Sequence, residues 1–298
     1  MSDRWKTLFA FAMIYFVWGS TYIAIRAGVE EVPPLLFAAM RFFAAGLALV
    51  VWTMAAREPW PNRREWASIC LLGAMIFLGD YGLLFWAEQK VPSGVAAVIM
   101  AIIPVFIALA DIAILRTHRM TMRLAIALTI GVAGVAVLMS RSLHLGGEPV
   151  STAGAVALII ASILWSIATV LTRKLPLPQS KVQSAGGQML TGGVMLAVVS
   201  AALGETSRFH AAAVSERAWL ALVYLILVGS IAGFTSFLWL IHRKSPTKVG
   251  TYAYVNPLVA VLLGYLVEGE ALGLRTVLGT VCVLVSVVVI TTTRAKQA

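Results

Sequence analysis

The stretch Thr7–Ile25, TLFAFAMIYFVWGSTYIAI, decides the fold class of this chain. It contains no charged residue, and it has the length that a helix needs to cross a bilayer, roughly 20 residues. Its apolar residues run on without the regular alternation that the strands of a membrane barrel show. The stretch therefore predicts a transmembrane helix.

Similar apolar stretches follow along the whole chain. With 60% apolar and 12% charged residues, the 298-residue sequence is too apolar for a soluble domain. We therefore expect an all-α integral membrane protein with ten transmembrane helices. The predicted spans lie near residues 7–25, 35–56, 65–87, 93–115, 121–140, 153–173, 183–203, 218–241, 248–267 and 273–293.

The basic residues indicate how the chain is oriented. The net charge of +10 is scattered over the loops and forms no cluster of the kind that binds nucleic acid. Lys and Arg residues concentrate in alternate loops, beginning with Arg4 and Lys6 before the first span. Because such loops stay in the cytoplasm, we predict that both termini are cytoplasmic and that the partner is the lipid bilayer, with no nucleic acid.

The second half of the sequence repeats features of the first in the same order. The matched pairs are Trp18 with Trp165, Arg26 with Arg173, Trp86 with Trp239, Pro104 with Pro257, and Arg123 with Arg275. Each copy holds five predicted helices, an odd number, so the second copy enters the membrane from the opposite side. We predict two inverted five-helix repeats, residues 1–145 and 146–298. Transporters with such repeats bind substrate between the halves, near the midplane.

Several motifs together suggest a family. They are Trp18-Gly19-Ser20, the stretch from Trp86 through Pro92 to Pro104, then Trp239, Pro246, Asn256-Pro257, and Leu266–Leu272 with Glu270. With these motifs the chain resembles the EamA-type members of the drug/metabolite transporter superfamily. The resemblance covers essentially the whole chain and implies a ten-helix transporter of the bacterial inner membrane. Its length and aromatic content look most like exporters of amino acids, including aromatic ones.

One departure from relatives bears on mechanism. Small four-helix relatives exchange protons through a glutamate in their first helix. The first span of this chain, Thr7–Ile25, contains no acidic residue, so that mechanism cannot be transferred.

Ionisable residues inside the predicted spans are candidates for function, because each costs roughly 2.5–3.5 kcal/mol to insert. Arg41 and Asp111 lie near enough to span ends to serve as ion pairs or interfacial anchors. Asp80 lies deeper, where it either lines a polar cavity or bonds between helices. Glu88, near the end of the third span, is more typical of an interfacial carboxylate.

Aromatic residues give a second signal. Phe11, Tyr15, Trp18 and Tyr22 recur at spacings of 4, 3 and 4, which places them on one helix face. Such a stripe usually packs against another helix. However, Trp18 and Trp165 fall in mid-span, away from the interfaces that Trp favours, and are related by the repeat. This pair favours a cavity wall whose rings could attract an ammonium group.

Proline residues suggest where helices could open toward a substrate. Pro104 and Asn256-Pro257 could break their helices and free backbone groups for a substrate carboxylate, although a simple kink is equally compatible. The predicted substrate-binding residues are Tyr15, Trp18, Phe77, Asp80, Tyr81, Met100, Trp165, Phe234, Tyr254 and Asn256. No metal site and no cofactor are predicted.

The favoured function is secondary transport, namely export of neutral or aromatic amino acids and related small metabolites by alternating access, with the protein acting as a monomer.

The main alternative is a multidrug exporter of cationic compounds. A nucleotide-sugar carrier would need several basic residues in the cavity, and only Arg41 qualifies. A channel would need a filter loop, and none stands out. A membrane-embedded enzyme is the remaining alternative, but it would need converging acids, nucleophiles or metal ligands. The histidines fall in loops or at span ends.

Overall fold

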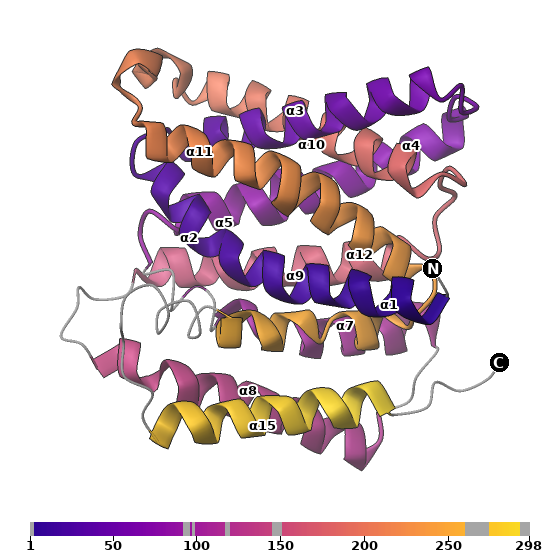
Figure 1. Cartoon of the computed structure of the whole chain (residues 1–298), viewed down its shortest axis with the longest axis vertical. Helices are drawn as coiled ribbons and strands as arrows, with labels where there is room; N and C mark the ends of the chain where they lie inside the picture. Colours follow the sequence, from indigo (N-terminus) through magenta and orange to yellow (C-terminus); the bar gives the residue numbers. More distant parts are fainter. Residues whose placement is uncertain are drawn as a thin grey trace.

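The structure is a computed structural model and describes residues 3–91, 96, 99–116, 120–144, 151–259 and 274–292. In these ranges all regular secondary structure is helical. The helices lie side by side as one bundle (Figure 1). Pro92 and Glu270, which belong to the family motifs, lie outside the described residues.

Two spans of the first half are long helices with a π-helical segment in the middle. The first consists of α1 (Asp3–Ala12), η1 (Met13–Val17) and α2 (Trp18–Val29). The second is α4 (Arg63–Gly73), η2 (Ala74–Tyr81) and α5 (Gly82–Ala87). The other helices of this half are α3 (Pro34–Ala55), α7 (Ile103–Ala110) with η3 (Asp111–Leu115), and α8 (Met122–His144).

The second half has a similar series. It contains α9 (Thr152–Leu171), α10 (Lys181–Ala202), the short turns η4 (Thr206–Arg208) and η5 (Ala211–Ala213), then α11 (Glu216–Tyr224), η6 (Leu225–Ala232) and α12 (Gly233–Ile241). After them come α13 (Pro246–Val249), a helical segment over 252–259, and α15 (Leu274–Thr292). A π-helical segment again divides the span from α11 to α12.

Local sequence explains several helix starts. Asn62 accepts hydrogen bonds from the N–H groups of Arg64 and Glu65, and the Glu65 carboxylate accepts one from the Asn62 N–H, so a capping box begins α4. Ser180 and Ser215 cap α10 and α11 through their side-chain oxygens. These caps fix where the connections end and the apolar helices begin.

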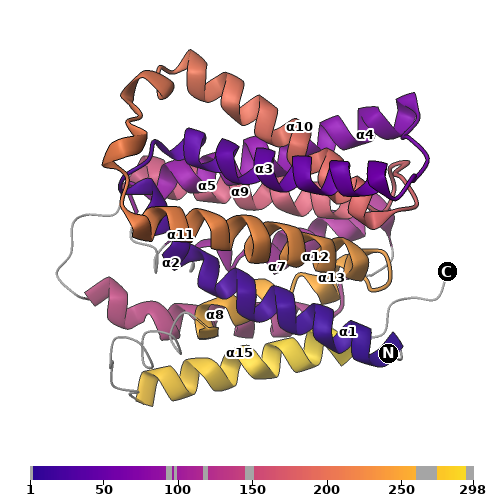
Figure 2. The ribbon, with the colours of Figure 1, turned by 45° about the horizontal axis from the view of Figure 1, so that its top comes forward.

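Six helices in the described part of the chain are long and apolar enough to cross a membrane. They are Arg4–Val29, Pro34–Ala55, Arg63–Ala87, Thr152–Leu171, Lys181–Ala202 and Glu216–Ile241. Three shorter apolar helices cover Ile103–Leu115, Met122–Gly134 and Val281–Ile290. The total of ten spans and the cytoplasmic location of the termini stay predictions. Helix α1 begins and α15 ends at the same end of the bundle, as an even number of crossings requires (Figures 1 and 2).

The main helix pairs join the two halves. Helix α3 packs on α10 at one edge of the bundle, and α8 packs on α15 at the other (Figure 1). Between these edges, the α1–α2 span contacts α11 and α12, α9 contacts η2 and α5, and α7 contacts α13. The repeat matches the α1–α2 span with α9, α3 with α10, the α4–α5 span with the α11–α12 span, α7 with α13, and α8 with α15. If each helix is replaced by its match in the other half, the same set of pairs results. That is the pattern expected of a pseudo-twofold axis between repeats.

Glycines allow α3 and α10 to touch through their backbones. A Cβ atom added at Gly46 would lie 2.3 Å from the Leu190 nitrogen, and one at Gly193 would lie 2.5 Å from the Phe43 nitrogen. Position 43 thus faces 193 while position 46 faces 190, so the two helices run antiparallel. Small residues at such a contact serve helix packing in the membrane.

Candidate functional site

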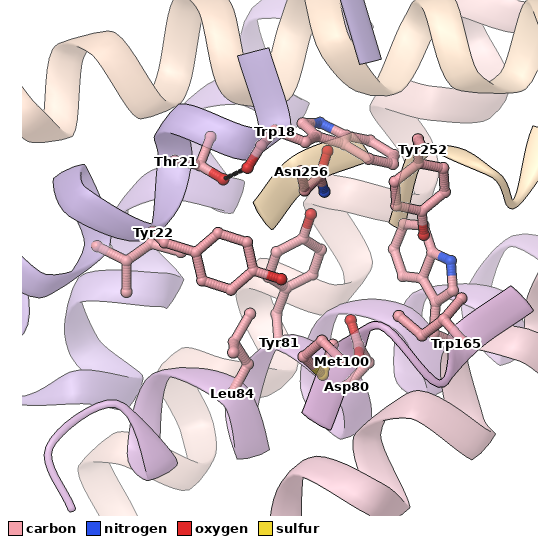
Figure 3. Close-up of a pocket in the computed structure, with 12 residues that line it drawn as sticks. Trp18, Thr21, Tyr22, Asp80, Tyr81, Leu84, Met100, Trp165, Tyr252 and Asn256 are labelled. Carbon is pink, nitrogen blue, oxygen red and sulfur yellow. Dashed lines mark hydrogen bonds between the residues drawn. The ribbon is translucent and has the colours of Figure 1, made fainter. Parts of the chain in front are cut away.

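A narrow cavity lies between the two halves of the bundle (Figure 3). Its walls come from α2, η2, α5, α9, the start of α7, and the segment 252–259. The lining residues are Trp18, Thr21, Tyr22, Ile25, Asp80, Tyr81, Leu84, Met100, Ile103, Trp165, Tyr252 and Asn256. The space open to the centre of a water molecule is about 40 Å³, which is enough for a few waters and too little for a metabolite. The structure is therefore a contracted state of the site.

Four rings from four separate segments form an aromatic cage, defined here as Trp18, Tyr81, Trp165 and Tyr252. The Trp18 and Trp165 ring centroids lie 5.4 Å apart with the planes at 83°, so the pair predicted across the repeat is in edge-to-face contact. Tyr252 meets Trp18 edge-on at 4.9 Å, and Tyr81 meets Trp165 edge-on at 5.9 Å. Such contacts are worth about 0.5–1.5 kcal/mol each beyond the area they bury.

The Trp18 ring is fixed from behind by η6 and α12. Its Nε1 donates to the Gly229 carbonyl at 3.1 Å. A Cβ atom at Gly233 would lie 2.6 Å from the same nitrogen, so only glycine leaves room for the indole there. A residue of the first span is thereby held by the eighth span, in the other half of the molecule.

Asp80 brings a carboxyl group to the cavity from η2. It is 2% exposed, and its Oδ1 has no hydrogen-bond partner among the described residues. Of the two roles that the sequence allowed for Asp80, the structure shows the cavity-lining one. A buried, unpaired carboxyl is costly to keep, which makes Asp80 a candidate for function.

Trp165 supplies an unpaired donor to the same cavity. This residue is 3% exposed, and its Nε1 has no acceptor within the described ranges. Helix α7 begins nearby at Ile103, after a turn at residues 101–102, so the break predicted before Pro104 is present. The positive end of the α7 dipole therefore lies at the cavity wall.

Hydrogen bonds from α9 hold the chain around this break. The Ser162 hydroxyl lies 3.3 Å from the Met100 sulfur, and the Ser166 hydroxyl donates to the Ile103 carbonyl at 3.4 Å. On the opposite wall, the Asn256 amide is oriented so that its nitrogen donates to the carbonyls of Tyr252 and Tyr15, at 3.0 and 3.2 Å. Polar groups on both walls thus tie backbone of one half to the other.

Four predicted substrate residues do not line the cavity, and their assignment is revised. The Tyr15 hydroxyl bonds to Thr251 Oγ1 at 2.7 Å, beside the cavity rather than in it. The Phe77 and Phe234 rings pack on each other, 5.1 Å apart, in the apolar core behind Tyr81. The Tyr254 hydroxyl donates to the Leu128 carbonyl at 3.2 Å, in a smaller cluster that packs α8 and α15 against the bundle.

Six lining residues were not in the predicted set: Thr21, Tyr22, Ile25, Leu84, Ile103 and Tyr252. Tyr22 belongs to the aromatic stripe of the first span, so its signal was present in the sequence. Tyr252 lies just after the turn at residues 250–251, where the helix is interrupted. The sequence analysis named Tyr254, whereas Tyr252 is the residue of this segment that lines the cavity together with Asn256.

The other charges predicted inside the spans lie away from the cavity. Arg41 is 1% exposed, donates through Nε to Ser230 Oγ at 2.8 Å, and stacks its guanidinium over the Phe42 and Tyr81 rings. It stays behind Tyr81 and does not reach an interface. Asp111 is fully buried and accepts a hydrogen bond from Thr247 at 3.2 Å, which joins η3 to α13.

A bundle of apolar helices that encloses a cavity between two matched halves defines the class of membrane transporters built from repeats. The chain belongs to the EamA-like transporter family, whose sequence profile matches it twice, over residues 5–140 and 152–292. It is therefore a multi-pass transporter of the inner membrane.

The relatives agree with this class. The chain is 36% identical over 280 residues to the "Uncharacterized inner membrane transporter YedA" of Escherichia coli (strain K12), covering 93% of this chain and 88% of that protein. It is 26% identical to "Protein PecM" of Dickeya dadantii, covering 92% and 88%. A solved structure titled "Crystal structure of protein" matches with a TM-score of 0.74 at 20% identity, covering 96% of this chain and 97% of that one. That structure shares the fold.

Proposed function

We propose that the protein exports neutral or aromatic amino acids and related small metabolites across the inner membrane by alternating access. The observation that carries the proposal is the pairing of an unpaired Asp80 oxygen with an unpaired Trp165 N–H on one aromatic cavity. An amino acid offers an ammonium group to the first and a carboxylate to the second. The rings of the aromatic cage would cover an apolar or aromatic side chain.

The contacts at the two ends of the bundle support a rocking motion. On the predicted outer side, Glu31 accepts hydrogen bonds from Ser215, and Glu205 accepts one from the Leu36 N–H. On the opposite side, Gln183 donates to the Pro59 carbonyl at 3.0 Å. Each of these contacts joins the first half to the second through hydrogen bonds alone. The contacts at one end of the bundle can therefore open while those at the other end stay closed.

Counterflow in reconstituted vesicles tests the proposal. Unlabelled amino acid inside should accelerate entry of labelled amino acid, because a carrier returns faster when loaded. Asp80→Asn and Trp165→Phe each remove one polar partner of the substrate, so we expect about a tenfold loss of exchange, equivalent to about 1.4 kcal/mol. Trp52→Phe, on the exposed face of α3, is the matched control and should leave exchange unchanged. Absence of counterflow with every neutral and aromatic amino acid would contradict the proposal.

A second function is favoured by one observation. Asp80 and the aromatic cage together suit a cationic compound, since the ring faces and the carboxylate both attract positive charge. The Asp80→Asn variant separates the two functions. If the wild type exports a cationic dye and exchanges no amino acid, and Asp80→Asn loses the dye export, the protein is a drug exporter of the same family.

A further inference from the structure

Glu88 is a buried carboxyl group outside the cavity that the transport proposal does not use. It follows Ala87, the last residue of the third apolar span, and is 0% exposed. Neither of its carboxyl oxygens has a hydrogen-bond partner among the described residues. An interfacial carboxylate, which the sequence suggested, would reach water or a donor. Glu88 does neither, so that interpretation is revised.

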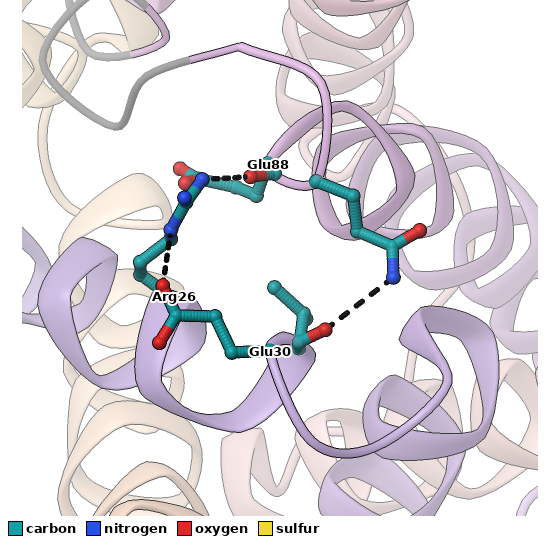
Figure 4. Close-up of polar contacts among 5 residues, drawn as sticks. Arg26, Glu30 and Glu88 are labelled. Carbon is teal, nitrogen blue, oxygen red and sulfur yellow. Dashed lines mark hydrogen bonds and ion pairs between the residues drawn. The ribbon is translucent and has the colours of Figure 1, made fainter.

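The surroundings of Glu88 place it just beneath water on the predicted outer side (Figure 4). Arg26 Nη1 donates to the main-chain carbonyl of Glu88 at 2.7 Å, while its Nε pairs with the Glu30 carboxylate at 2.8 Å. The Arg26 and Glu30 side chains are 42% and 52% exposed. Arg26 is thus engaged by the Glu88 main-chain carbonyl and by Glu30, and both of these partly exposed side chains lie next to Glu88 in space or through its backbone.

Tyr22 connects this carboxyl to the cavity. It lies one turn before Arg26 on α2, so the two side chains share a helix face. Its hydroxyl points into the cavity (Figure 3) and lies within electrostatic range of both Glu88 and Asp80. Leu84, one turn before Glu88, lines the cavity as well. The Tyr22 phenol is therefore close enough to interact with both carboxyl groups.

Within the described part of the chain, the other charged and titratable groups near Glu88, Tyr22 and Asp80 form no ion pair with either carboxyl group. Tyr81 and Tyr252 face Asp80, and the Arg41 guanidinium lies behind the Tyr81 ring. Among the described residues, Arg26 of α2 is the charged group that acts on Glu88, while the Lys90 ammonium lies over the Trp86 ring, 4.9 Å away. Burial raises the pKa of the Glu88 carboxyl to about 8, against the opposing effect of Arg26. Glu88 can thus gain or lose its proton close to neutral pH.

We propose that Glu88 and Asp80 are the outer and inner proton-binding groups of a route through Tyr22, and that this route couples transport to proton movement. The inference rests on the proposed function and adds its coupling ion. Tyr22 gives its hydroxyl proton to the Asp80 carboxylate and receives one from the Glu88 carboxyl, directly or through cavity water. Glu88 then takes a proton from outside water, so one proton moves inward. A substrate ammonium competes with that proton for Asp80, which makes the two exchange.

Vesicles with an imposed pH gradient test the route through Glu88→Gln and Tyr22→Phe, which keep the size of each side chain. Glu88→Gln should retain counterflow within about twofold of the wild type, because Glu88 lies outside the cavity and counterflow needs no net proton. Tyr22 lines the cavity, so the gradient response of Tyr22→Phe is measured relative to the counterflow of that same variant. Acceleration of transport by the pH gradient should fall by about fivefold or more, equivalent to about 1 kcal/mol. Glu216→Gln, an exposed carboxyl at the start of α11, should keep the full response.

The outcomes separate the two proposals. Counterflow in the wild type without any response to the pH gradient overturns proton coupling and leaves transport intact. A Glu88→Gln protein that responds fully to the gradient overturns the role of Glu88. If no amino acid exchanges at all, the function proposal fails, and the route is tested without substrate. Thermal unfolding of the wild type should then become easier from pH 6 to 9, and that of Glu88→Gln should not; equal pH dependence overturns the route.

Discussion

Trp18 shows how much of the site depends on single side chains. Its ring meets Trp165, Phe237 and Tyr252 at centroid distances of 4.9 to 5.4 Å, and its N–H holds the Gly229 carbonyl. One residue of the first span thereby contacts the sixth and eighth spans and the segment after α13. The Trp18 indole thus lies at the centre of the interface between the two halves.

Trp18→Phe tests that role. The variant keeps a ring and loses the hydrogen bond to the Gly229 carbonyl, at a cost of about 0.5–1.5 kcal/mol. We expect a lower midpoint of thermal unfolding in detergent. Trp52→Phe, whose side chain is 68% exposed on α3, provides the comparison and should melt as the wild type does. Equal midpoints of thermal unfolding for all three proteins would show that Trp18 does not stabilise the interface between the halves.

At this scale the sequence predicted residues best where the two halves match. Trp18 and Trp165 correspond to each other in the repeat, and their rings are in contact. Tyr252 was missed, and Tyr254 of the same segment was named instead. The burial of Glu88 was unpredictable from its position near a span end, because burial depends on how Arg26 and the neighbouring spans pack over it.

The helical elements carry a feature that hydropathy does not encode. Four π-helical segments, η1, η2, η3 and η6, interrupt otherwise α-helical spans. Such bulges are often found at functional sites, and η2 carries both Asp80 and Tyr81. They also add residues to a turn, so side chains after them leave the face that a regular period predicts. Phe77, within η2, and Phe234, just after η6, are predicted residues that pack in the apolar core.

Helix packing gives the next prediction, at the contact between α3 and α10. In Gly193→Val, the new side chain meets the Phe43 backbone, which cannot rotate away. Overpacking of this kind costs about 1–3 kcal/mol, and we expect lower yield of folded protein and a lower unfolding midpoint. Ala48→Val adds the same bulk to the exposed side of α3 and should have little effect. If both variants unfold alike, the helices are not in backbone contact.

For the whole molecule, the Glu31–Ser215 contact links the two halves on the predicted outer side. The Ser215 side chain and backbone N–H both donate to the carboxylate, and these bonds lower the pKa of Glu31. A lowered pKa in the folded state means that the contact stabilises the fold above the usual Glu value. That stability is lost as the pH falls through the lowered pKa.

The corresponding experiment compares the wild type with Glu31→Gln. At pH 6 the wild type should unfold at the higher temperature, and the difference should shrink toward pH 3 as Glu31 takes up a proton. The effect will be small, because the side chain is exposed to solvent, which screens the charge. Glu216→Gln should show no such pH-linked difference. A gap between wild type and Glu31→Gln that stays constant with pH would argue against the contact.

At the molecular scale, composition alone predicts an all-helical membrane protein, since lipid tolerates neither exposed backbone nor many charges. The repeat predicts which helices pair across the halves, and the packing of α3 on α10 and of α8 on α15 agrees with it. The size of the cavity could not be predicted. It depends on how far the halves close, which is a property of packing that no single residue determines.

The small volume of the cavity has a consequence for ligand measurements. A metabolite finds no room in the contracted form, so it binds only to molecules that have already opened. The apparent dissociation constant then equals the intrinsic one divided by the open fraction; an open fraction of about one in a hundred weakens it about a hundredfold. A ligand that fits the opened site well will therefore show a weak apparent affinity. A substitution that merely favours opening will lower the apparent dissociation constant of every ligand by the same factor.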